Sequence, residues 1–212
     1  MIQITYTQIS DTYTTGQWQK WLALLPTPMQ QQNRRFVQWK DRLRHLFGKL
    51  LLRDMLMAAG FGPDCLAQLY YNEFNRPYIS EAVDFNLSHS GDIVICAFTK
   101  TGKIGIDVEQ VAPVDFSDFD NVMTPEQWQR IHAAPDAQRM FFTCWAIKES
   151  MIKAESSGMS LPLLQIHING NYVYYKDRIW HVRELPLHPD YCTWLCSDRA
   201  IGEYDLQERW FD

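Results

Sequence analysis

Apolar residues recur at helical spacing in two parts of the chain. Between residues 36 and 59 the large apolar side chains fall on one stripe at about 100° per residue, which predicts a long amphipathic helix. Gly60 and Pro63 predict its end, because glycine accepts a left-handed cap and proline cannot continue a helix. The same spacing predicts a second long helix from Arg139 to about Ser156.

Short stretches of strand-like residues lie between and after these helices. A run of short strands with single helices is typical of an α+β fold rather than of alternating βαβ units. Each half of the chain then holds one long helix with several strands, and the cleanest division falls near residue 103. Residues 1–6 alternate like a strand, and the other predicted strands are residues 69–71, 85–88, 93–99, 103–109, 165–168, 172–175, 179–183 and 191–197.

The composition indicates a globular protein with a filled core. Hydrophobic residues make up 46% and charged residues 21% of the 212 residues, which excludes a disordered or collagen-like chain. No stretch approaches about 18 consecutive apolar residues, and the amino terminus lacks a signal-peptide pattern, so we expect neither a membrane span nor export. The five cysteines lack zinc-like spacing and favour reduced thiols and a cytoplasmic location.

Charge is divided unevenly along the chain, whose formal net charge is −5. Residues 1–104 hold 11 of the 20 basic and 8 of the 25 acidic side chains, so the later half is strongly acidic. A basic cluster between Arg34 and Arg53 indicates contact with an anion, although a solvated helix face is the plainer interpretation. Nucleic acid is disfavoured as a partner, because the whole chain is acidic and carries no recognised nucleic-acid-binding module.

Asp107 and Glu109 form the first candidate site. Side chains alternate along a strand, so both carboxylates project from one face of the strand predicted at 103–109, about 7 Å apart. Two carboxylates this close repel each other unless a cation or a basic side chain lies between them. Metal binding is one interpretation, and an exposed edge strand is the other.

The second long helix carries the second candidate. Lys148 falls inside the apolar stripe, where an unpaired ammonium group is costly, so we expect it to point into a cleft that holds an anion. Glu149 and Lys153 are helical neighbours, and a routine salt bridge also accounts for them. If Glu149 meets Asp107 and Glu109, three carboxylates converge, a ligand set that suits Mg²⁺ or Mn²⁺.

Two turn segments offer groups that bind phosphate. Ser88, His89 and Ser90 precede Gly91 and supply hydroxyls, an imidazole and free backbone N–H groups. A Ser/His hydrolase is the alternative, but neighbouring residues at a strand end do not easily form the nucleophile–base contact, and no G-x-S-x-G elbow is present. Arg76 precedes a proline that fixes the turn, which favours phosphate recognition by the guanidinium group.

In this order, the segments resemble the 4′-phosphopantetheinyl transferase superfamily, specifically its Sfp-type branch. Each motif is weak alone, whereas the ordered set is specific and spans roughly residues 25–165. The parts that carry the resemblance are residues 34–36, Arg44, Gly48, and residues 75–77, 85–90, 105–109, 145–153 and 158–162.

The resemblance implies an α+β fold of two similar lobes related by pseudo-two-fold symmetry, each a long helix packed on an antiparallel sheet. Residues 1–103 and 104–212 would form the lobes, with coenzyme A in the cleft between them. The implied reaction transfers 4′-phosphopantetheine from coenzyme A to a serine of an apo acyl or peptidyl carrier protein. It releases adenosine 3′,5′-bisphosphate and depends on Mg²⁺. We expect a cytoplasmic monomer that binds neither nucleic acid nor membrane.

The resemblance also implies roles for individual residues. Asp107, Glu109 and Glu149 would hold Mg²⁺, with Mn²⁺ as an alternative, and catalysis would rest on Asp107, Glu149 and Lys153. Glu149 is a candidate general base for the carrier serine. The residues expected to bind coenzyme A are Arg44, Arg76, Ser88, His89, Lys148 and Lys153.

One stretch departs from the family pattern. Related enzymes often carry lysines just before the segment at 34–36, as part of a clamp on the 3′-phosphate of coenzyme A. This chain has Met29 to Gln32 there. The clamp is therefore weaker, or Arg34, Arg35 or Lys40 supplies it.

Two other functions stay open at this point. One is a catalytically silent module that binds coenzyme A or a carrier protein, and the other is a Mg²⁺-dependent pyrophosphohydrolase with the same carboxylates. Where a carrier is the partner, we expect contacts at residues 111–123 and 126–131, which are apolar and acidic.

Overall fold

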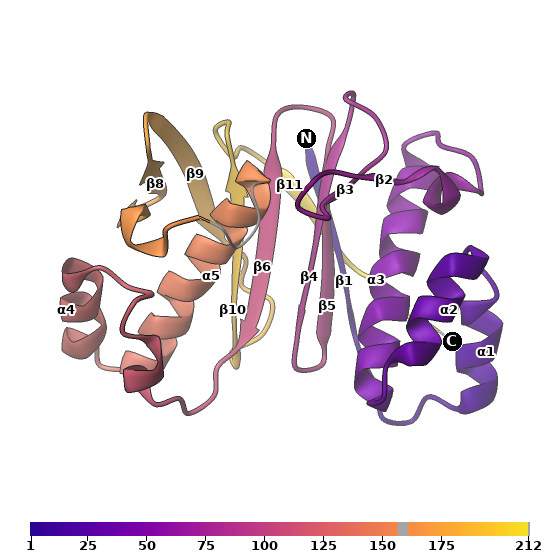
Figure 1. Cartoon of the computed structure of the whole chain (residues 1–212), viewed down its shortest axis with the longest axis horizontal. Coiled ribbons are helices and arrows are strands. Elements are labelled where there is room, and N and C mark those ends of the chain that lie inside the picture. Colours follow the sequence, from indigo (N-terminus) through magenta and orange to yellow (C-terminus); the bar gives the residue numbers. More distant parts are fainter. Residues whose placement is uncertain (157–160, 212) are drawn as a thin grey trace.

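The computed structural model describes residues 1–156 and 161–211. Its strands form two large sheets and a small hairpin at the centre, with helices on the outer sides (Figure 1). This arrangement confirms the predicted α+β class. Within the described residues, no helix is both long and apolar enough to cross a membrane.

The first sheet joins strands from both ends of the chain. Its order is β11 (Tyr204–Glu208), β1 (Ile2–Gln8), β5 (Ile93–Thr99) and β4 (Asp84–Ser90). The pairs β1–β5 and β4–β5 are antiparallel, whereas β11 runs parallel to β1. The last strand of the chain therefore lies in the sheet that the first half builds.

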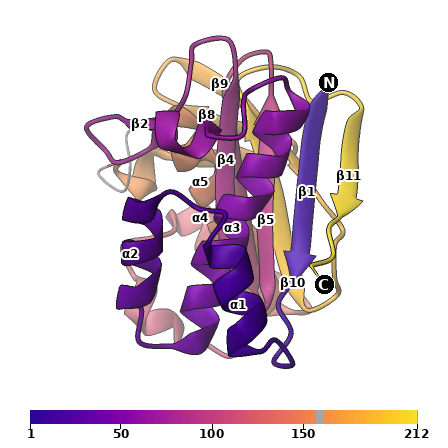
Figure 2. The same cartoon turned by 90° about the vertical axis from the view of Figure 1, so that its right-hand side faces the viewer.

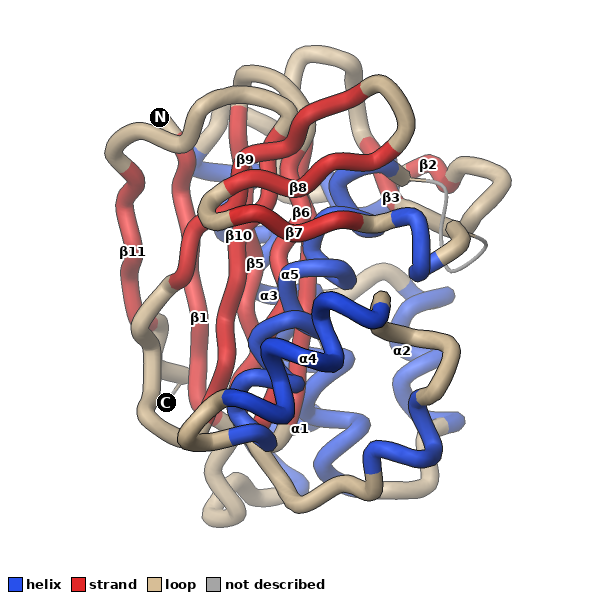
Figure 3. Tube along the Cα trace, turned by 90° about the vertical axis from the view of Figure 1, so that its left-hand side faces the viewer, coloured by secondary structure: helices blue, strands red, loops and turns tan. Residues whose placement is uncertain are grey.

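The second sheet is antiparallel throughout and belongs to the second half (Figure 3). Its order is β6 (Ile104–Gln110), β10 (Tyr191–Ser197), β9 (Arg178–Glu184), β8 (Tyr172–Tyr175) and β7 (His167–Asn169). A separate hairpin pairs β2 (Tyr70–Tyr71) with β3 (Pro77–Tyr78).

Each large sheet is covered by one long helix, α3 or α5. α3 (Trp39–Ala58) packs on the first sheet, and α1 (Thr15–Leu22) and α2 (Thr27–Arg35) lie beside it (Figure 2). α5 (Ala137–Glu155) packs on the second sheet together with α4 (Pro125–Ala133). The short 3₁₀ helices are Cys65–Gln68, Phe116–Phe119 and Leu163–Gln165.

The apolar stripes explain where the two long helices form. On α3 the stripe buries Leu43, Phe47 and Leu50 against the first sheet, as its spacing predicted. Gly60 follows with φ 103°, the left-handed conformation that glycine tolerates best. The second helix, predicted from Arg139 to about Ser156, is observed as α5 from Ala137 to Glu155.

Gly105 brings α5 directly onto β6. A Cβ atom at this position would clash with the backbone carbonyl of Ser150 and the backbone nitrogen of Ala154. Only glycine allows this approach, and the helix side chains around it consequently lie over the strand. Glu149 and Lys153 on α5 are placed next to β6 in this way.

The two sheets meet along β4 and β6 through side chains. These strands belong to different sheets, yet alternate side chains of β4 accept hydrogen bonds from alternate backbone N–H groups of β6. A polar face of one strand thus satisfies the edge of the other. The acceptors Asp84, Asn86, Ser88 and Ser90 take the N–H groups of Ile104, Ile106, Val108 and Gln110 at 2.8, 3.0, 3.4 and 3.0 Å.

Several elements were not predicted from the sequence, among them α1, α2, β3, β11 and the 3₁₀ helices. α2 reads TPMQQQNRR and buries only Met29 and Asn33, so it presents no apolar stripe. β11 is short and half-exposed, and it pairs in parallel with β1, which lies at the other end of the chain. The division at residue 103 and the pseudo-two-fold relation of the lobes stay predictions.

Candidate functional site

A cavity of about 490 Å³ opens where α3, β4, β6 and α5 meet. Each of these elements contributes polar side chains to it, so residues far apart in sequence share one space. Its lining comprises Phe36, Asp41, Arg44, His45, Gly48, Lys49, Leu87, Ser88, His89, Asp107, Glu109, Trp145, Glu149 and Lys153.

Asp107 lies at the floor of this cavity and is tied to two neighbours. The Lys153 ammonium donates to Asp107 Oδ1 at 2.6 Å and to Ser88 Oγ at 2.9 Å. The Ser88 hydroxyl donates to the same Asp107 oxygen at 2.8 Å. Oδ2 of Asp107 is buried and has no hydrogen-bond partner among the described residues. One carboxylate oxygen is therefore held in place while the other is available to a ligand.

Glu109 is held at both of its carboxylate oxygens. The Ser90 hydroxyl donates to Oε2 and the Trp145 indole N–H donates to Oε1, each at 3.0 Å. Burial raises the pKa of Glu109, and the nearby charge of Asp107 raises it further. This half-buried carboxylate is not the solvated edge residue that the alternative interpretation of the strand required.

Glu149 projects from α5 into the same cavity and is 9% exposed. Burial raises its pKa to about 7; the Lys153 ammonium opposes this shift, and Asp107 and Glu109 add to it. Its Oε1 is buried without a partner within the described part of the chain. A carboxylate with this pKa and an unoccupied oxygen is suited to accepting a proton near neutral pH.

The α3 side of the cavity is basic. The Arg44 guanidinium donates from Nε and Nη2 to the backbone carbonyl of Gly91, at 2.9 and 2.6 Å, and from Nη1 to Asp41 at 2.8 Å. These contacts fix the plane of the guanidinium beside Gly91, in the turn that follows β4. Ser88 and His89 were expected in a turn but belong to the end of β4, where His89 is exposed and lines the cavity. Cationic and acidic side chains consequently face one another across the space.

Lys148 does not line this cavity, which corrects the expectation that it points into an anion-holding cleft. Its side chain is fully buried within the second half, and the ammonium donates to the carbonyls of Val122 at 2.6 Å and Leu163 at 2.8 Å. The buried ammonium group is therefore satisfied by two carbonyl oxygens of the protein and not by a bound anion. The helical stripe correctly showed that Lys148 is internal, but it gave no information about which acceptors lie there.

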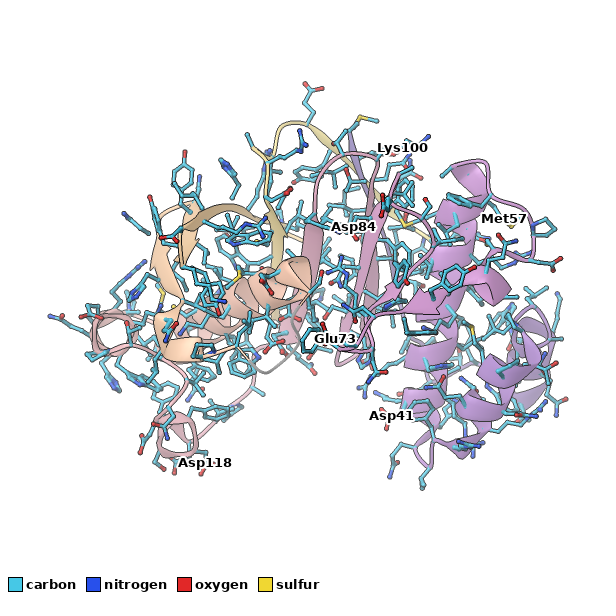
Figure 4. All side chains as sticks on the ribbon, turned by 45° about the horizontal axis from the view of Figure 1, so that its top comes forward. Asp41, Met57, Glu73, Asp84, Lys100 and Asp118 are labelled. Carbon is cyan, nitrogen blue, oxygen red and sulfur yellow. The ribbon has the colours of Figure 1, made fainter. Side chains whose placement is uncertain are left out.

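Arg76 is engaged with the protein itself and not with the central cavity. Its Nη2 donates to both oxygens of Asp84 at 2.8 Å, and to the carbonyls of Phe85 and Ile104 (Figure 4 labels Asp84, among the central strands). Both side chains of this ion pair are only 10% exposed. Arg76 also lines a smaller cavity of about 220 Å³ that shares Glu149 and Lys153 with the central one. The guanidinium therefore joins β4 to β6 beside the site.

The carboxylates of Asp107, Glu109 and Glu149 are oxygen donors of the kind that bind a hard metal ion. Among the described residues, no group of three or more His, Cys, Asp or Glu side chains has an arrangement that could hold one. All three candidate carboxylates line the cavity, but Lys153 occupies one oxygen of Asp107, and Glu109 is engaged at both. The unpartnered oxygens of Asp107 and Glu149 fit a hard cation such as Mg²⁺, which takes its other ligands from phosphate and water.

Sequence reasoning did not assign a site role to His45 or Trp145, and it named Lys49 only as a member of the basic cluster and Ser90 only as one of the hydroxyls before Gly91. Lys49 and His45 line the cavity from α3 with Asp41, Arg44 and Gly48. These positions follow one another at helical spacing, and this polar face was the signal that could have identified them. Ser90 and Trp145 lay within recognised motifs, but only the structure brings both of them to Glu109.

Comparison with known proteins identifies the family of the chain. A model of the 4′-phosphopantetheinyl transferase superfamily matches residues 103–202. A model described as 4′-phosphopantetheinyl transferase, N-terminal, matches residues 12–101. The two matches cover consecutive parts of the chain and together include every residue that lines the central cavity.

Three similar proteins are each named as a 4′-phosphopantetheinyl transferase. The 4′-phosphopantetheinyl transferase gsp of Aneurinibacillus migulanus is 33% identical over 68% of this chain and 62% of its own length. A 4′-phosphopantetheinyl transferase of Bacillus subtilis is 28% identical over 84% of this chain and 89% of its own. The 4′-phosphopantetheinyl transferase Sfp of Bacillus subtilis strain 168 is 29% identical over 72% and 71%. The chain belongs to the 4′-phosphopantetheinyl transferase superfamily and, within it, to the Sfp-like branch.

Proposed function

We propose that this protein transfers 4′-phosphopantetheine from coenzyme A to the hydroxyl of a serine on an apo acyl or peptidyl carrier protein. The observation that carries the proposal is a single cavity in a member of this family that places Asp107, Glu109, Glu149 and Lys153 opposite Arg44 and His89. Attack on a pyrophosphate needs a base, charge neutralisation and fixed geometry, and these residues offer each of them.

The reaction forms one bond and breaks one. The serine oxygen attacks the β-phosphorus of coenzyme A, which bears the pantetheine arm. The bond from that phosphorus to the bridging oxygen breaks, and the electron pair leaves with adenosine 3′,5′-bisphosphate. Glu149 accepts the serine proton, a role supported by its position in the cavity beside Lys153 and Asp107.

The cationic side chains neutralise the phosphates. Lys153 lies within 2.6 Å of Asp107 and is positioned to shift its ammonium toward the leaving bisphosphate. Arg44 and His89 line the same cavity, where the remaining phosphate oxygens of coenzyme A would lie, and the Ser88 hydroxyl lies beside Lys153. Pre-oriented donors of this kind stabilise charge that develops during the transfer.

Asp107 and Glu149, with Glu109 beside them, would hold Mg²⁺, and Mn²⁺ would occupy the same donor set. When bound, the ion neutralises negative charge on the pyrophosphate. The hydrogen bonds from Ser88, Ser90 and Trp145 orient two of these carboxylates. The carrier would approach over residues 111–123 and 126–131, which follow β6 along the chain.

Intact-mass spectrometry of carrier proteins tests this function. The protein is incubated with coenzyme A, Mg²⁺ and several apo acyl and peptidyl carriers, and a loaded carrier gains about 340 Da. Asp107→Asn should abolish the gain, whereas Asp205→Asn on β11, outside the cavity lining, should not change it. Coenzyme A binding without loading of any carrier would favour a silent binding module. Release of the bisphosphate without a carrier would favour a pyrophosphohydrolase.

A further inference from the structure

The chain leaves the second sheet directly after β6, whose last residues include Glu109. Residues 111–119 follow, and they are the first part of the stretch over which the carrier would approach. The Val111 N–H still donates to the carbonyl of Asp190 at 2.8 Å. In the part of the chain that the structure describes, residues 112–119 belong to no strand and form only the short 3₁₀ helix Phe116–Phe119. Side chains of α5 therefore have to hold this segment in place.

Gln138, in the first turn of α5, holds the middle of the segment with its side-chain amide. Its Oε1 accepts a hydrogen bond from the Val114 N–H at 3.2 Å, and its Nε2 donates to the Val114 carbonyl at 3.1 Å. The amide thus satisfies both backbone groups of one residue, as a neighbouring strand would. Asp136 fixes the turn that carries Gln138, because its carboxylate accepts from the Arg139 N–H at 2.9 Å as the helix cap.

Aromatic contacts decide which side chains of the segment face outward. Phe116 and Phe119 turn inward onto Phe141, with ring centroids 5.4 and 4.9 Å apart. Asp115 and Asp118 are exposed, and Figure 4 shows Asp118 at the periphery, away from the central strands. A shift of the backbone just ahead of these residues would therefore move the side chains that a partner protein meets.

The segment also touches the candidate site, but Gln138 does not. The ring of Phe119 lies 6.2 Å from that of Trp145, edge to face, and the Trp145 indole N–H donates to Glu109 Oε1 at 3.0 Å. Gln138 lines neither the central cavity nor the smaller one that shares Glu149 and Lys153 with it. Its amide can therefore affect how a partner is presented to the site without contacting coenzyme A or the carboxylates.

We propose that Gln138 is a positioning residue for the carrier protein: its amide sets the orientation of residues 111–119 and thereby the affinity for the carrier. The inference rests on the proposed function, because it takes a carrier as the partner of this segment. Gln138 lies outside each of the segments that carry the family resemblance. A glutamine suits the role because its amide offers an acceptor and a donor together, whereas a carboxylate lacks the donor.

Steady-state loading at varied carrier and coenzyme A concentrations tests this role, with an apo carrier that wild type loads. Gln138→Met keeps the length of the side chain and a good helix former but removes both hydrogen bonds to Val114. The KM for the carrier should rise about fivefold to twentyfold, while kcat and the KM for coenzyme A stay as in wild type. Gln207→Met, at an exposed glutamine of β11, is the matched control and should change none of the three constants.

Hydrogen exchange of the protein without substrates tests the physical cause. Amides of residues 111–115 should exchange faster in Gln138→Met, because the Val114 N–H loses its acceptor, while β6 and the rest of α5 keep their protection. A variant that only reduces the fraction of folded protein would instead lower the apparent kcat at an unchanged carrier KM. That pattern, or exchange identical to wild type, would overturn the proposal.

Binding of apo carriers, measured without coenzyme A, separates this inference from the proposed function. If wild type binds a carrier but loads none, the transferase proposal is contradicted, and weaker binding by Gln138→Met still supports the positioning role. If wild type loads a carrier and the carrier KM is the same in Gln138→Met, the role of Gln138 alone is contradicted. A wild type that neither binds nor loads any carrier contradicts both.

Discussion

The two walls of the central cavity hold their charged groups in different ways. On the β6 and α5 wall, Asp107 accepts hydrogen bonds from Lys153 and Ser88, and Glu109 accepts one at each oxygen. On the α3 wall, Arg44 is tied to a backbone carbonyl, but Lys49 has no partner in the described structure. The protein itself therefore holds Asp107 and Glu109 on the acidic wall and Arg44 on the basic wall, whereas Lys49 has no partner among the described residues.

This difference suggests a division of labour between the walls. Groups that act on a reacting atom benefit from being fixed before substrate arrives, because no reorganisation is then needed in the transition state. Groups that select a ligand benefit from an unsatisfied charge, because the wrong ligand leaves that charge buried and unpaired. Asp107 and Glu109 have the first property, and Lys49 is the cation on the α3 wall that has no partner among the described residues.

The largest expected effect comes from the acidic wall. Glu149→Gln keeps the shape of the side chain but removes the proton acceptor, so carrier loading should fall about 10²–10⁴-fold. The Kd for coenzyme A should change far less, since the amide still fills the same space. Initial rates from intact-mass time courses measure the loss, and exposed Glu203→Gln serves as the control. Near-normal loading by Glu149→Gln would remove Glu149 from the role of base.

Substitution of Arg76 tests whether its ion pair with Asp84, beside the contact of β4 with β6, stabilises the fold. Arg76→Ala leaves Asp84 buried without its cation, so the free energy of unfolding should fall by about 3–5 kcal/mol. Denaturant titration measures this fall, with the exposed Arg178→Ala as a comparison. The resemblance to the family had implied that Arg76 binds coenzyme A. Unchanged stability with weakened coenzyme A binding would support that role instead.

Lys148 and Lys153 lie on one helix, yet we expect them to have different roles. Lys148→Met leaves the carbonyls of Val122 and Leu163 without their donor, which should reduce the free energy of unfolding by about 1–3 kcal/mol. Loading by the folded variant should stay close to wild type. Lys153→Met should abolish loading by the folded variant, and it should also lower the free energy of unfolding, because buried Asp107 loses its cation. Loss of loading in Lys148→Met at full stability would show that Lys148 contacts substrate after all.

The smallest expected effect concerns the orientation of Glu109. Trp145→Phe removes the indole N–H that Glu109 Oε1 accepts, so the Mg²⁺ concentration needed for half-maximal loading should rise about tenfold. Excess Mg²⁺ should restore the rate, which a merely destabilised protein would not show. Trp210→Phe, at an exposed position, is the control. A rate loss that no concentration of Mg²⁺ rescues would contradict an orienting role for Trp145.

Sequence patterns predicted the elements in which buried apolar side chains recur at a regular spacing. The stripes of α3 and α5 gave both helices to within a few residues, and β5 was predicted with its observed bounds. α2 escaped prediction because its packing rests on two buried residues in a polar segment. β11 escaped because its partner, β1, lies at the other end of the chain.

The candidate site shows the same limit: a sequence pattern places a residue on a face or in the interior, but it does not show which groups the fold brings next to that residue. Alternation along β6 placed Asp107 and Glu109 on one face, and both line the cavity. The helix pattern placed Lys148 inside the protein, but only the fold brings two carbonyl oxygens to it. Lys49 looked like any other member of a basic cluster, because the absence of a partner is a property of the folded chain.

The most direct measurement of the central claim follows both products of a single reaction. An apo carrier is incubated with the protein, coenzyme A and Mg²⁺, and the carrier mass and the released nucleotide are measured together. The account predicts a gain of about 340 Da on the carrier and one adenosine 3′,5′-bisphosphate for each carrier modified. Bisphosphate release without a matching gain in carrier mass, or neither product despite bound coenzyme A, would contradict it.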